Sequence, residues 1–408
     1  MLQKAQNSKE DSIDAEIEEE IRLAWNKVYA DYYLNNSTDR AKALATELGV
    51  EQEAVTISSD GKTISINYRE KNKVLDLING IIKEPSAVEK AKIVERFDDN
   101  TPITDEYGNT FIVPKGFKIA NDSAENVTEG IVIEDVTYTN TIGSQFVWIP
   151  ISKDNKKIVG PAYSGVDRIE KKEILISLGR YTFKNDGTLD IIKSDGGEFS
   201  ITYPWNETYK FKEENKRATG SSNAVAKDIE IFTTNAKASG GFWIGRYEAR
   251  TTSKNDRTSE NDTLTSVTEN KDNAIYNYIK QNDASVISQD MYKKENDGTT
   301  DITKFQSDLI NSYAWDTTIL FLQEFGKKEY SIYNGRLQNS TDGTNDIFCN
   351  IYNMSSYYYW TTENCSKSNA PCVYRACYSD ADYSSGRWYG RTTSISEKFS
   401  FRPILYVN

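Results

Sequence analysis

The chain has 408 residues, of which 38% are hydrophobic and 27% are charged, and its formal net charge is -12 at pH 7. A chain of this length is expected to form more than one domain. The acidic balance and the lack of a long Lys/Arg run argue against nucleic acid as a partner, because phosphate recognition needs a basic surface.

Histidine is absent from the sequence. This removes the commonest general base, the usual zinc ligand and every Ser-His or Cys-His nucleophile pair. Carboxylate, Tyr, Lys or Cys chemistry remains open, so an enzyme is disfavoured and not excluded; we expect no catalytic residues and no cofactor apart from a structural calcium ion, considered below. The four cysteines, Cys349, Cys365, Cys372 and Cys377, follow no zinc-binding spacing. They allow one or two disulfides in an exported protein, or free thiols without a role.

The sequence contains no apolar run of the roughly 20 residues that span a bilayer, and its first residues lack the apolar core of a signal peptide. We expect no membrane span within these 408 residues. A polar helix directly after Met1 is also what would remain if a native N-terminal anchor had been removed.

Residues 1–95 are expected to form a small α+β domain. Apolar residues recur every three or four positions over residues 13–32, which predicts an amphipathic helix, and a second helix follows to residue 48. Residues 54–57 and 63–68 alternate around an Asp-Gly turn and predict a hairpin. Clustered apolar residues over 74–82 predict another short helix.

A second domain is expected over residues 100–408, where the composition shifts to short strands and Gly/Asn/Asp turns. We place the boundary between residues 95 and 102. Two polar tracts, residues 152–239 and 251–303, are expected to be insertions or loop-rich elaborations. Between residues 314 and 325, apolar spacing ended by Gly326 predicts the best helix of this half.

Four separated pieces of this second domain carry a resemblance. They are Phe-Val-Trp-Ile-Pro at 146–150, Gly-Gly-Phe-Trp-Ile-Gly-Arg-Tyr-Glu-Ala at 240–249, the helix with Trp315, and residues 350–403 with their closing Arg-Pro. In order and content they resemble the formylglycine-generating-enzyme (sulfatase-modifying factor) branch of the C-type lectin fold. The resemblance implies that the first two segments lie side by side, and that Trp148, Trp243, Tyr247 and Trp315 are core residues.

The chain departs from this family where the family is most constant. The expected Gly-Asn pair is missing from Asn-Met-Ser-Ser-Tyr-Tyr-Tyr-Trp at 353–360, and Arg-Gly-Gly-Ser becomes Arg-Ala-Cys-Tyr at 375–378. Oxidase members of the family bind copper through two cysteines, and Cys365, Cys372 and Cys377 do not occupy that motif. A copper-dependent oxidase is therefore kept only as an alternative function.

The departures fit another branch of the fold better, the variable proteins of diversity-generating retroelements. In these proteins, mutation of adenines in AAC codons gives codons that cannot encode Lys, Glu, Gln, Met or Trp. Apart from Trp388, every residue between 373 and 395 belongs to the permitted set. The resemblance implies a variable region over residues 353–395.

The composition of this region independently predicts a binding surface, because Tyr, Ser, Gly, Asp and Arg are typical of antibody paratopes. Tyr/Ser strands that only cover a sheet edge are the competing interpretation, and three consecutive tyrosines at 357–359 cannot all face one way. The predicted ligand-binding residues are Ser356, Tyr357, Tyr359, Tyr374, Tyr378, Ser379, Asp380, Asp382, Tyr383, Ser384, Ser385, Arg387, Tyr389 and Arg391.

The sequence contains aspartates that are candidate calcium ligands. Asp342, Asp346, Asp380 and Asp382 could hold a structural calcium ion, although Asp in a loop more often caps a turn. The Glu-Pro-Asn and Trp-Asn-Asp signatures of sugar-binding C-type lectins are absent. A fixed calcium-dependent sugar lectin remains the third alternative.

Residues 1–95 resemble, in pattern only, the soluble part of a type IV pilin-like protein of Gram-positive bacteria; an ordinary packing helix is the competing interpretation. This resemblance implies an extracellular location on the cell surface or a pilus, with other pilins as partners of the N-terminal helix. Together the two resemblances predict an adhesin-like protein that binds a protein or cell-surface ligand.

Overall fold

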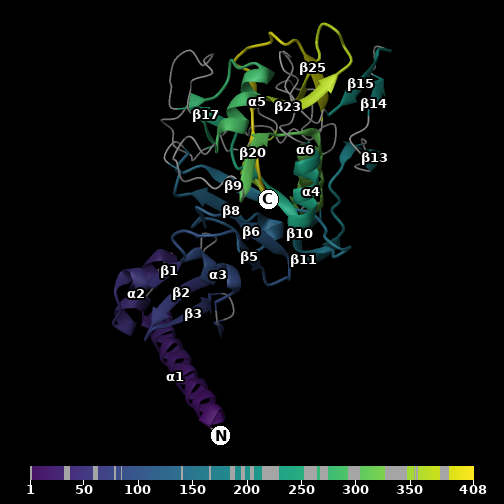
Figure 1. Cartoon of the computed structure of the whole chain (residues 1–408). Helices are drawn as coiled ribbons and strands as arrows, with labels where there is room; N and C mark the ends of the chain where they lie inside the picture. Colours follow the sequence, from purple (N-terminus) through teal and green to yellow (C-terminus); the bar gives the residue numbers. More distant parts are fainter. Residues whose placement is uncertain are drawn as a thin grey trace. The chain divides into compact units, whose positions relative to one another are not determined.

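The computed structural model describes most of the chain and divides it into two compact units, Met1–Lys90 and Ala91–Asn408 (Figure 1). Both units combine helices with antiparallel sheets, so the predicted α+β class is confirmed. The structure describes residues 2–31, 37–57, 63–77, 80–83, 85–138, 141–164, 167–183, 189–193, 198–202, 206–213, 229–251, 264–266, 274–292, 304–326, 347–352, 354, 357–376 and 386–408.

The first unit packs two helices on a four-stranded antiparallel sheet. Helix α1 (Leu2–Asp31) buries Ile17, Ile21 and Val28 in a core shared with α2 (Ser37–Leu48) and the sheet. The strands are β1 (Val55–Ile57), β2 (Thr63–Tyr68), β3 (Lys71–Asp76) and β4 (Ile82–Lys83), in that order, and a short 3-10 helix, Gln52–Ala54, precedes β1. The predicted amphipathic helix and the predicted hairpin are therefore confirmed.

The helix predicted over residues 74–82 is wrong, because this segment forms β3 and β4. Arg69 and Glu70 have positive φ angles of 49° and 64°, which turn the chain back on β2. Leu75 then lies opposite Ile64, and Val74 lies opposite Ser65. Pairing with β2 explains the clustered apolar residues, which local spacing cannot distinguish from a short helix.

The core of the second unit is a six-stranded sheet in the order β20-β27-β16-β9-β8-β7. Its middle strands are β9 (Gln145–Pro150) and β16 (Gly241–Gly245), which pair so that Trp148 lies opposite Trp243 with ring centroids 5.0 Å apart. The two Trp-containing segments are therefore neighbours, as predicted. The other strands are β7 (Phe117–Ile119), β8 (Val132–Asp135), β20 (Phe305–Leu309) and β27 (Pro403–Val407).

Helices cover this sheet. Phe232 of α4 (Ile229–Ser239) contacts Phe242 and Tyr406, with ring centroids 5.5 and 5.4 Å apart. Helix α6 (Ser312–Phe321) continues as a π-helical turn, Leu322–Gly326, and begins where the Asn311 side chain accepts a hydrogen bond from the Ala314 amide. Trp148, Trp243, Tyr247 and Trp315 are all buried, as predicted. The remaining helices are α3 (Ala87–Lys92) and α5 (Gln281–Asp290).

A second six-stranded sheet has the order β14-β15-β23-β24-β25, with β26 parallel to β23. Because β26 leads directly into β27, it joins the two sheets. The strands are β14 (Phe199–Thr202), β15 (Thr208–Lys212), β23 (Tyr358–Cys365), β24 (Cys372–Arg375), β25 (Arg387–Gly390) and β26 (Phe399–Phe401).

The two polar tracts expected to be insertions contain regular structure. Within residues 152–239 the chain forms two hairpins before β14, and β15 pairs with β23, so this tract extends the second sheet. The smaller elements are β5 (Thr101–Thr104), β6 (Thr110–Val113), a 3-10 helix (Val127–Glu129), β10 (Ile158–Ser164), β11 (Asp167–Ile174), β12 (Arg180–Phe183), β13 (Leu189–Lys193), β17 (Ala249–Thr251), β18 (Leu264–Ser266), β19 (Ala274–Ile275), β21 (Ile347–Phe348) and β22 (Ile351–Tyr352).

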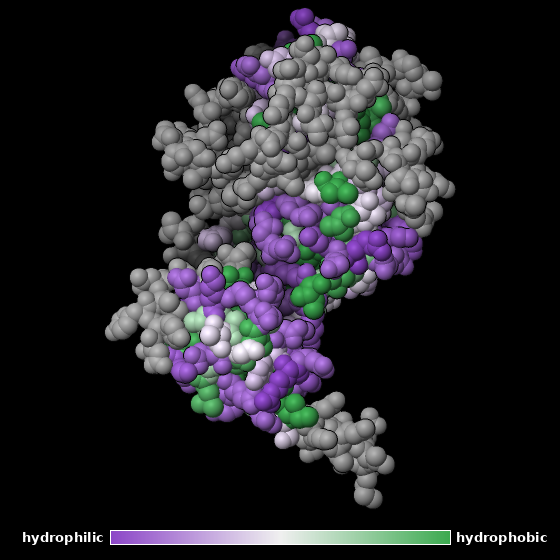
Figure 2. Space-filling model, turned by 90° about the vertical axis from the view of Figure 1, so that its left-hand side faces the viewer, coloured by the Kyte–Doolittle hydropathy of each residue, from purple (hydrophilic) through white to green (hydrophobic). Residues whose placement is uncertain are grey.

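On the face drawn in Figure 2, hydrophilic residues cover most of the described surface of each unit, with a few hydrophobic residues between them. Ile93, Ile142 and Leu175 are among the exposed apolar residues. Single exposed apolar side chains of this kind are normal for folded proteins. Within the described residues, no helix combines the length and the apolar character needed to cross a bilayer.

Replacing Gly130 with alanine is expected to lower the free energy of unfolding by about 1–3 kcal/mol. Gly130 has φ 96°, and an added Cβ would lie 2.0 Å from the Cys349 carbonyl oxygen. Gly108→Ala is the matched control, because Gly108 has φ 83° but only a lysine tip, that of Lys156, near its Cβ position. Urea unfolding measures both variants; equal losses would show that backbone conformation, and not the clash, sets the cost.

Candidate functional site

The predicted binding residues fall into two groups. Eight of them, Ser356, Tyr378, Ser379, Asp380, Asp382, Tyr383, Ser384 and Ser385, lie outside the described residues. Tyr374, Arg387 and Tyr389 lie on β24 and β25, the two strands that flank residues 377–385. Tyr357 directly precedes β23, Tyr359 is the second residue of that strand, and Arg391 follows β25 and is exposed.

The pairing of β24 with β25 decides which of these side chains share a face. Tyr374 lies opposite Trp388, while Val373 lies opposite Tyr389 and Arg375 lies opposite Arg387. Because side chains alternate along a strand, Tyr374 and Trp388 occupy one face of the sheet. The two arginines and Tyr389 occupy the other face.

The face with Tyr374 carries an aromatic cluster, which we call the aromatic ledge: Tyr358, Trp360, Tyr374 and Phe399. Trp360 is buried and stacks on Phe399, with centroids 4.4 Å apart and an interplanar angle of 4°. Tyr358 lies 4.9 Å from Tyr374 and 5.2 Å from Phe399, again between ring centroids. The Trp360 indole also donates to the Ile279 carbonyl, so the ledge has a fixed base and half-buried tyrosines above it.

On the opposite face the structure differs from the prediction for two residues. Tyr359 is fully buried against Trp315, with ring centroids 5.4 Å apart, and Arg387 is 6% exposed. Neither side chain lies on the surface as predicted for an anchoring residue. The reason is the alternation of side chains along β23: Tyr358 faces the aromatic ledge, whereas Tyr359 faces the core on the other side of the sheet. The half-buried Tyr357 lies on the same side as Tyr359, with ring centroids 6.2 Å apart.

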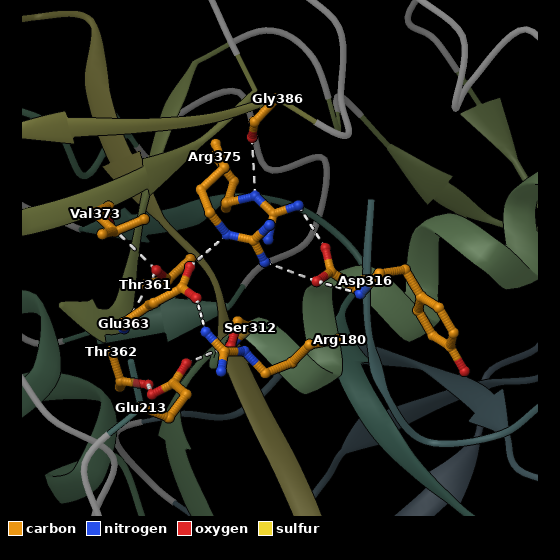
Figure 3. Close-up of polar contacts among 12 residues, drawn as sticks. Arg180, Glu213, Ser312, Asp316, Thr361, Thr362, Glu363, Val373, Arg375 and Gly386 are labelled. Carbon is orange, nitrogen blue, oxygen red and sulfur yellow. Dashed lines mark hydrogen bonds and ion pairs between the residues drawn. The ribbon is translucent and has the colours of Figure 1, made fainter. Parts of the chain in front are cut away.

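Arg387 belongs to a group of charged side chains that we call the buried ion-pair network: Arg180, Glu213, Asp316, Glu363, Arg375 and Arg387 (Figure 3). Arg375 and Arg387 both donate to the Asp316 carboxylate, the second over 2.8 Å. Arg387 also donates to Glu363 over 2.6 Å, and Arg180 donates to the other oxygen of Glu363. The network therefore joins α6, β12, β23, β24 and β25.

Glu213 extends the network from the end of β15. Its carboxylate accepts hydrogen bonds from the Ser312 amide over 2.6 Å and from the Thr362 hydroxyl over 2.8 Å (Figure 3). Burial, followed by the negative charge of Glu363, raises the pKa of Glu213 from 4.5 to about 7. Glu363 behaves oppositely: burial alone would raise its pKa, but Arg387, Arg180 and Arg375 hold it below the usual value.

The network fixes both ends of the segment between β24 and β25. The Arg375 Nε donates to the Gly386 carbonyl over 2.8 Å, directly before β25. Buried charges are tolerated only when they are paired and hydrogen-bonded, as they are here. Sequence reasoning missed Arg180, Asp316 and Glu363, because the ion-paired residues are separated by 24 to 183 positions. A local signal was a carboxylate, Asp316, inside an otherwise uncharged and buried helix.

The described residues offer little metal chemistry. Cys349, Cys365 and Cys372 carry free thiols, and burial raises the pKa of the Cys372 thiol to about 12. Within the described part of the chain, no group of three or more Cys, Asp or Glu side chains is arranged to hold a metal ion. Cys377 and the candidate calcium ligands Asp342, Asp346, Asp380 and Asp382 lie outside the described residues, so a structural calcium ion stays a prediction.

The strands that flank residues 377–385 in the chain thus carry partly exposed aromatic side chains as well as arginines of the buried ion-pair network. Comparison with known proteins found no match among protein-family models, curated proteins or solved structures.

Proposed function

We propose that residues 100–408 form a ligand-binding domain in which residues 377–385 and the strands beside them contact a protein or cell-surface target. One observation carries this proposal. Arg375 and Arg387, on the two strands that flank the segment, are locked into the buried ion-pair network, while Tyr374, Trp388 and Tyr389 of the same strands remain partly exposed.

This combination suits recognition. A rigid frame reduces the conformational entropy that binding would cost, and tyrosines give a large contact area with few rotatable bonds. The sequence between the frame strands is Cys-Tyr-Ser-Asp-Ala-Asp-Tyr-Ser-Ser, which supplies the polar and aromatic groups typical of paratopes. We therefore retain Tyr374, Tyr389, Arg391 and the eight residues outside the described part as contact residues. Tyr357 stays a prediction, whereas Arg387 and Tyr359 are assigned supporting positions.

The fold we propose for this unit is the C-type lectin fold of the formylglycine-generating-enzyme type. Support comes from the direct pairing of β9 with β16, which brings the two most family-like segments together, and from the buried Trp148, Trp243 and Trp315. We further propose that a diversity-generating retroelement varies residues 353–395. The first unit is proposed as a pilin-like part that displays the domain on a bacterial surface or pilus, through contacts of its N-terminal helix with other pilins.

The DNA beside the gene tests diversification without any protein. We expect a reverse-transcriptase gene and a near-copy of the coding sequence for residues 353–395 that differs mainly at adenines. A neighbourhood without such a copy contradicts diversification but leaves ligand binding open.

A displayed library tests the binding surface directly. We expect randomisation of Tyr378, Ser379, Asp380, Tyr383 and Ser384 to yield binders to an arbitrary test protein such as lysozyme, because a rigid frame tolerates change between its strands. Selected variants are expected to keep the parent's unfolding temperature within about 2 °C.

The matched control library randomises exposed positions of the β5–β6 hairpin, namely Pro102, Thr104, Glu106 and Thr110. It is expected to give no binders at the same stringency. Equal enrichment from both libraries, or unfolded variants from the first, would contradict the proposed surface.

A further inference from the structure

Where β23 ends, a lysine ammonium group lies against two neighbouring tyrosine rings. Lys367 lies in the turn after β23, Tyr209 lies on β15 and Tyr389 lies on β25. The Lys367 Nζ is 4.7 Å from the ring centroid of Tyr209 and 4.1 Å from that of Tyr389. These distances are well within the range at which an aromatic face attracts a cation.

Polar groups complete the surroundings of this ammonium group. The Lys367 Nζ donates to the Tyr389 hydroxyl over 3.0 Å and lies 3.5 Å from a carboxylate oxygen of Glu207. The Tyr209 hydroxyl donates to the same carboxylate oxygen over 2.6 Å. Two rings, a hydroxyl and a carboxylate therefore converge on one position. We call Tyr209, Tyr389 and Glu207 the aromatic cage.

The cage is supported by the backbone around it. The two rings contact each other, with centroids 4.9 Å apart and an interplanar angle of 64°, so they form two adjoining walls. The Ser366 amide donates to the Lys210 carbonyl over 2.8 Å, and the Lys210 amide donates to the Ser366 hydroxyl over 3.0 Å. These bonds hold the turn that carries Lys367 against β15. The cage is also accessible, because the Lys367 side chain is 23% exposed and that of Glu207 is 50% exposed.

We propose that the aromatic cage is a binding subsite for a lysine ammonium group of the target, and that Lys367 occupies it until the target displaces it. The chemistry favours a primary ammonium group, because the hydroxyl and the carboxylate use its N–H donors, which a quaternary ammonium lacks. The net charge of -12 favours encounter with a cationic partner. This subsite extends the proposed binding surface and rests on it for the nature of the target.

The presence of Lys367 in the cage explains how the site can discriminate between a free lysine and a larger target. A tethered side chain competes at an effective concentration in the millimolar range or above. A free lysine in solution therefore binds weakly, whereas a target that also contacts the neighbouring strands can displace Lys367. Glu207 and Tyr209 belong to the tract first interpreted as an insertion, so that tract would supply a fixed part of the site.

The test removes Lys367 from the cage and supplies a small ligand that carries one lysine ammonium group. Nα-acetyl-lysine amide is titrated against the 408-residue protein and its Lys367→Ala variant, with ligand-observed NMR as the readout. We expect the variant to bind at least tenfold more tightly than the parent. The same ligand acetylated at Nε, which has no charge, is expected not to bind, and tetramethylammonium is expected to bind more weakly than the primary amine.

A second variant, Lys367→Ala with Tyr389→Leu, also removes one wall of the cage. We expect it to bind the ligand less tightly than Lys367→Ala alone does. Thermal unfolding of each variant shows that it is folded. Binding no tighter than the parent's, equal binding of the acetylated ligand, or binding kept without Tyr389 would each overturn the proposal and leave Lys367 as a packing residue. The small ligand needs no target, so this result is independent of the displayed library.

Discussion

Asp316→Ala is expected to lower the free energy of unfolding of the second unit by about 3–5 kcal/mol. The Asp316 carboxylate accepts hydrogen bonds from Arg375, Arg387 and the Tyr181 amide, and it is fully buried. Its removal leaves Arg387 paired with Glu363 and Arg375 donating to the Gly386 carbonyl, without the carboxylate to which both buried guanidinium groups donate. Urea unfolding measures the loss, and we expect faster amide hydrogen exchange in β24 and β25.

Two control variants test whether the loss of stability comes from the buried network and not merely from removing a carboxylate. Asp98 forms an ion pair with Arg96 at the surface, where both side chains are largely exposed, so Asp98→Ala is expected to cost little. Combining Asp316→Ala with Arg375→Met removes both partners of one contact. The double variant is expected to lose less stability than the sum of the two single variants. Additive losses would contradict a coupled network.

Glu213→Gln is expected to stabilise the protein at neutral pH and to have little effect below pH 4.5. The pKa of the Glu213 carboxyl is raised from 4.5 to about 7 by burial and by Glu363. A raised pKa means that the folded state binds the proton more tightly than the unfolded state. Its stability contribution is therefore complete below pH 4.5 and is lost as the pH rises through 7.

The size of the effect follows from this pKa difference, which corresponds to about 3 kcal/mol at pH 8. Glutamine resembles the protonated acid and stays uncharged at every pH. The difference in unfolding free energy between variant and parent should therefore grow between pH 4.5 and 8. Unfolding free energies measured at several pH values test this. A difference that stays constant across the range would show that Glu213 is not a buried, proton-linked group.

Glu363→Gln serves as the control of opposite sign. The three arginines hold the pKa of Glu363 below its usual value, so its contribution to stability is present above that value and is lost as the pH falls. We therefore expect Glu363→Gln to destabilise the protein at pH 7 and to destabilise it less in acid. Both variants remove one negative charge from the same network, which excludes a general effect of net charge.

Much of the scaffold could be predicted from local pattern. The spacing of Ile17, Ile21 and Val28 specifies a helix with one buried face, and the alternation around residues 59–62 specifies a hairpin. Large aromatics in short apolar runs, such as Trp148 and Trp243, identify core strands because little else can bury such side chains together. These features depend on neighbours within a few residues, which is the range over which a single sequence is informative.

The candidate site was predictable only in part. The tyrosines and serines indicated a binding surface from composition, but Arg375 and Arg387 belong to the same composition and yet are buried. Their burial depends on Asp316 of α6 and Glu363 of β23, which accept their hydrogen bonds. These residues are far apart in the sequence, so no local spacing pattern predicts the contact. The role of Tyr209 and Lys367 was hidden for the same reason, because β15 joins the sheet from a tract that looked like an insertion.

The position of β27 also constrains the order in which the second unit can form during synthesis. This strand lies between β20 and β16 in the central sheet, yet it follows all the other strands of that sheet in the chain. Residues 403–407 must therefore be synthesised before β27 can pair with both β16 and β20 and complete the sheet. Contacts between such distant segments slow folding, and the unfinished sheet leaves strand edges exposed meanwhile. We infer that this unit folds late, after residues 353–395 have been translated.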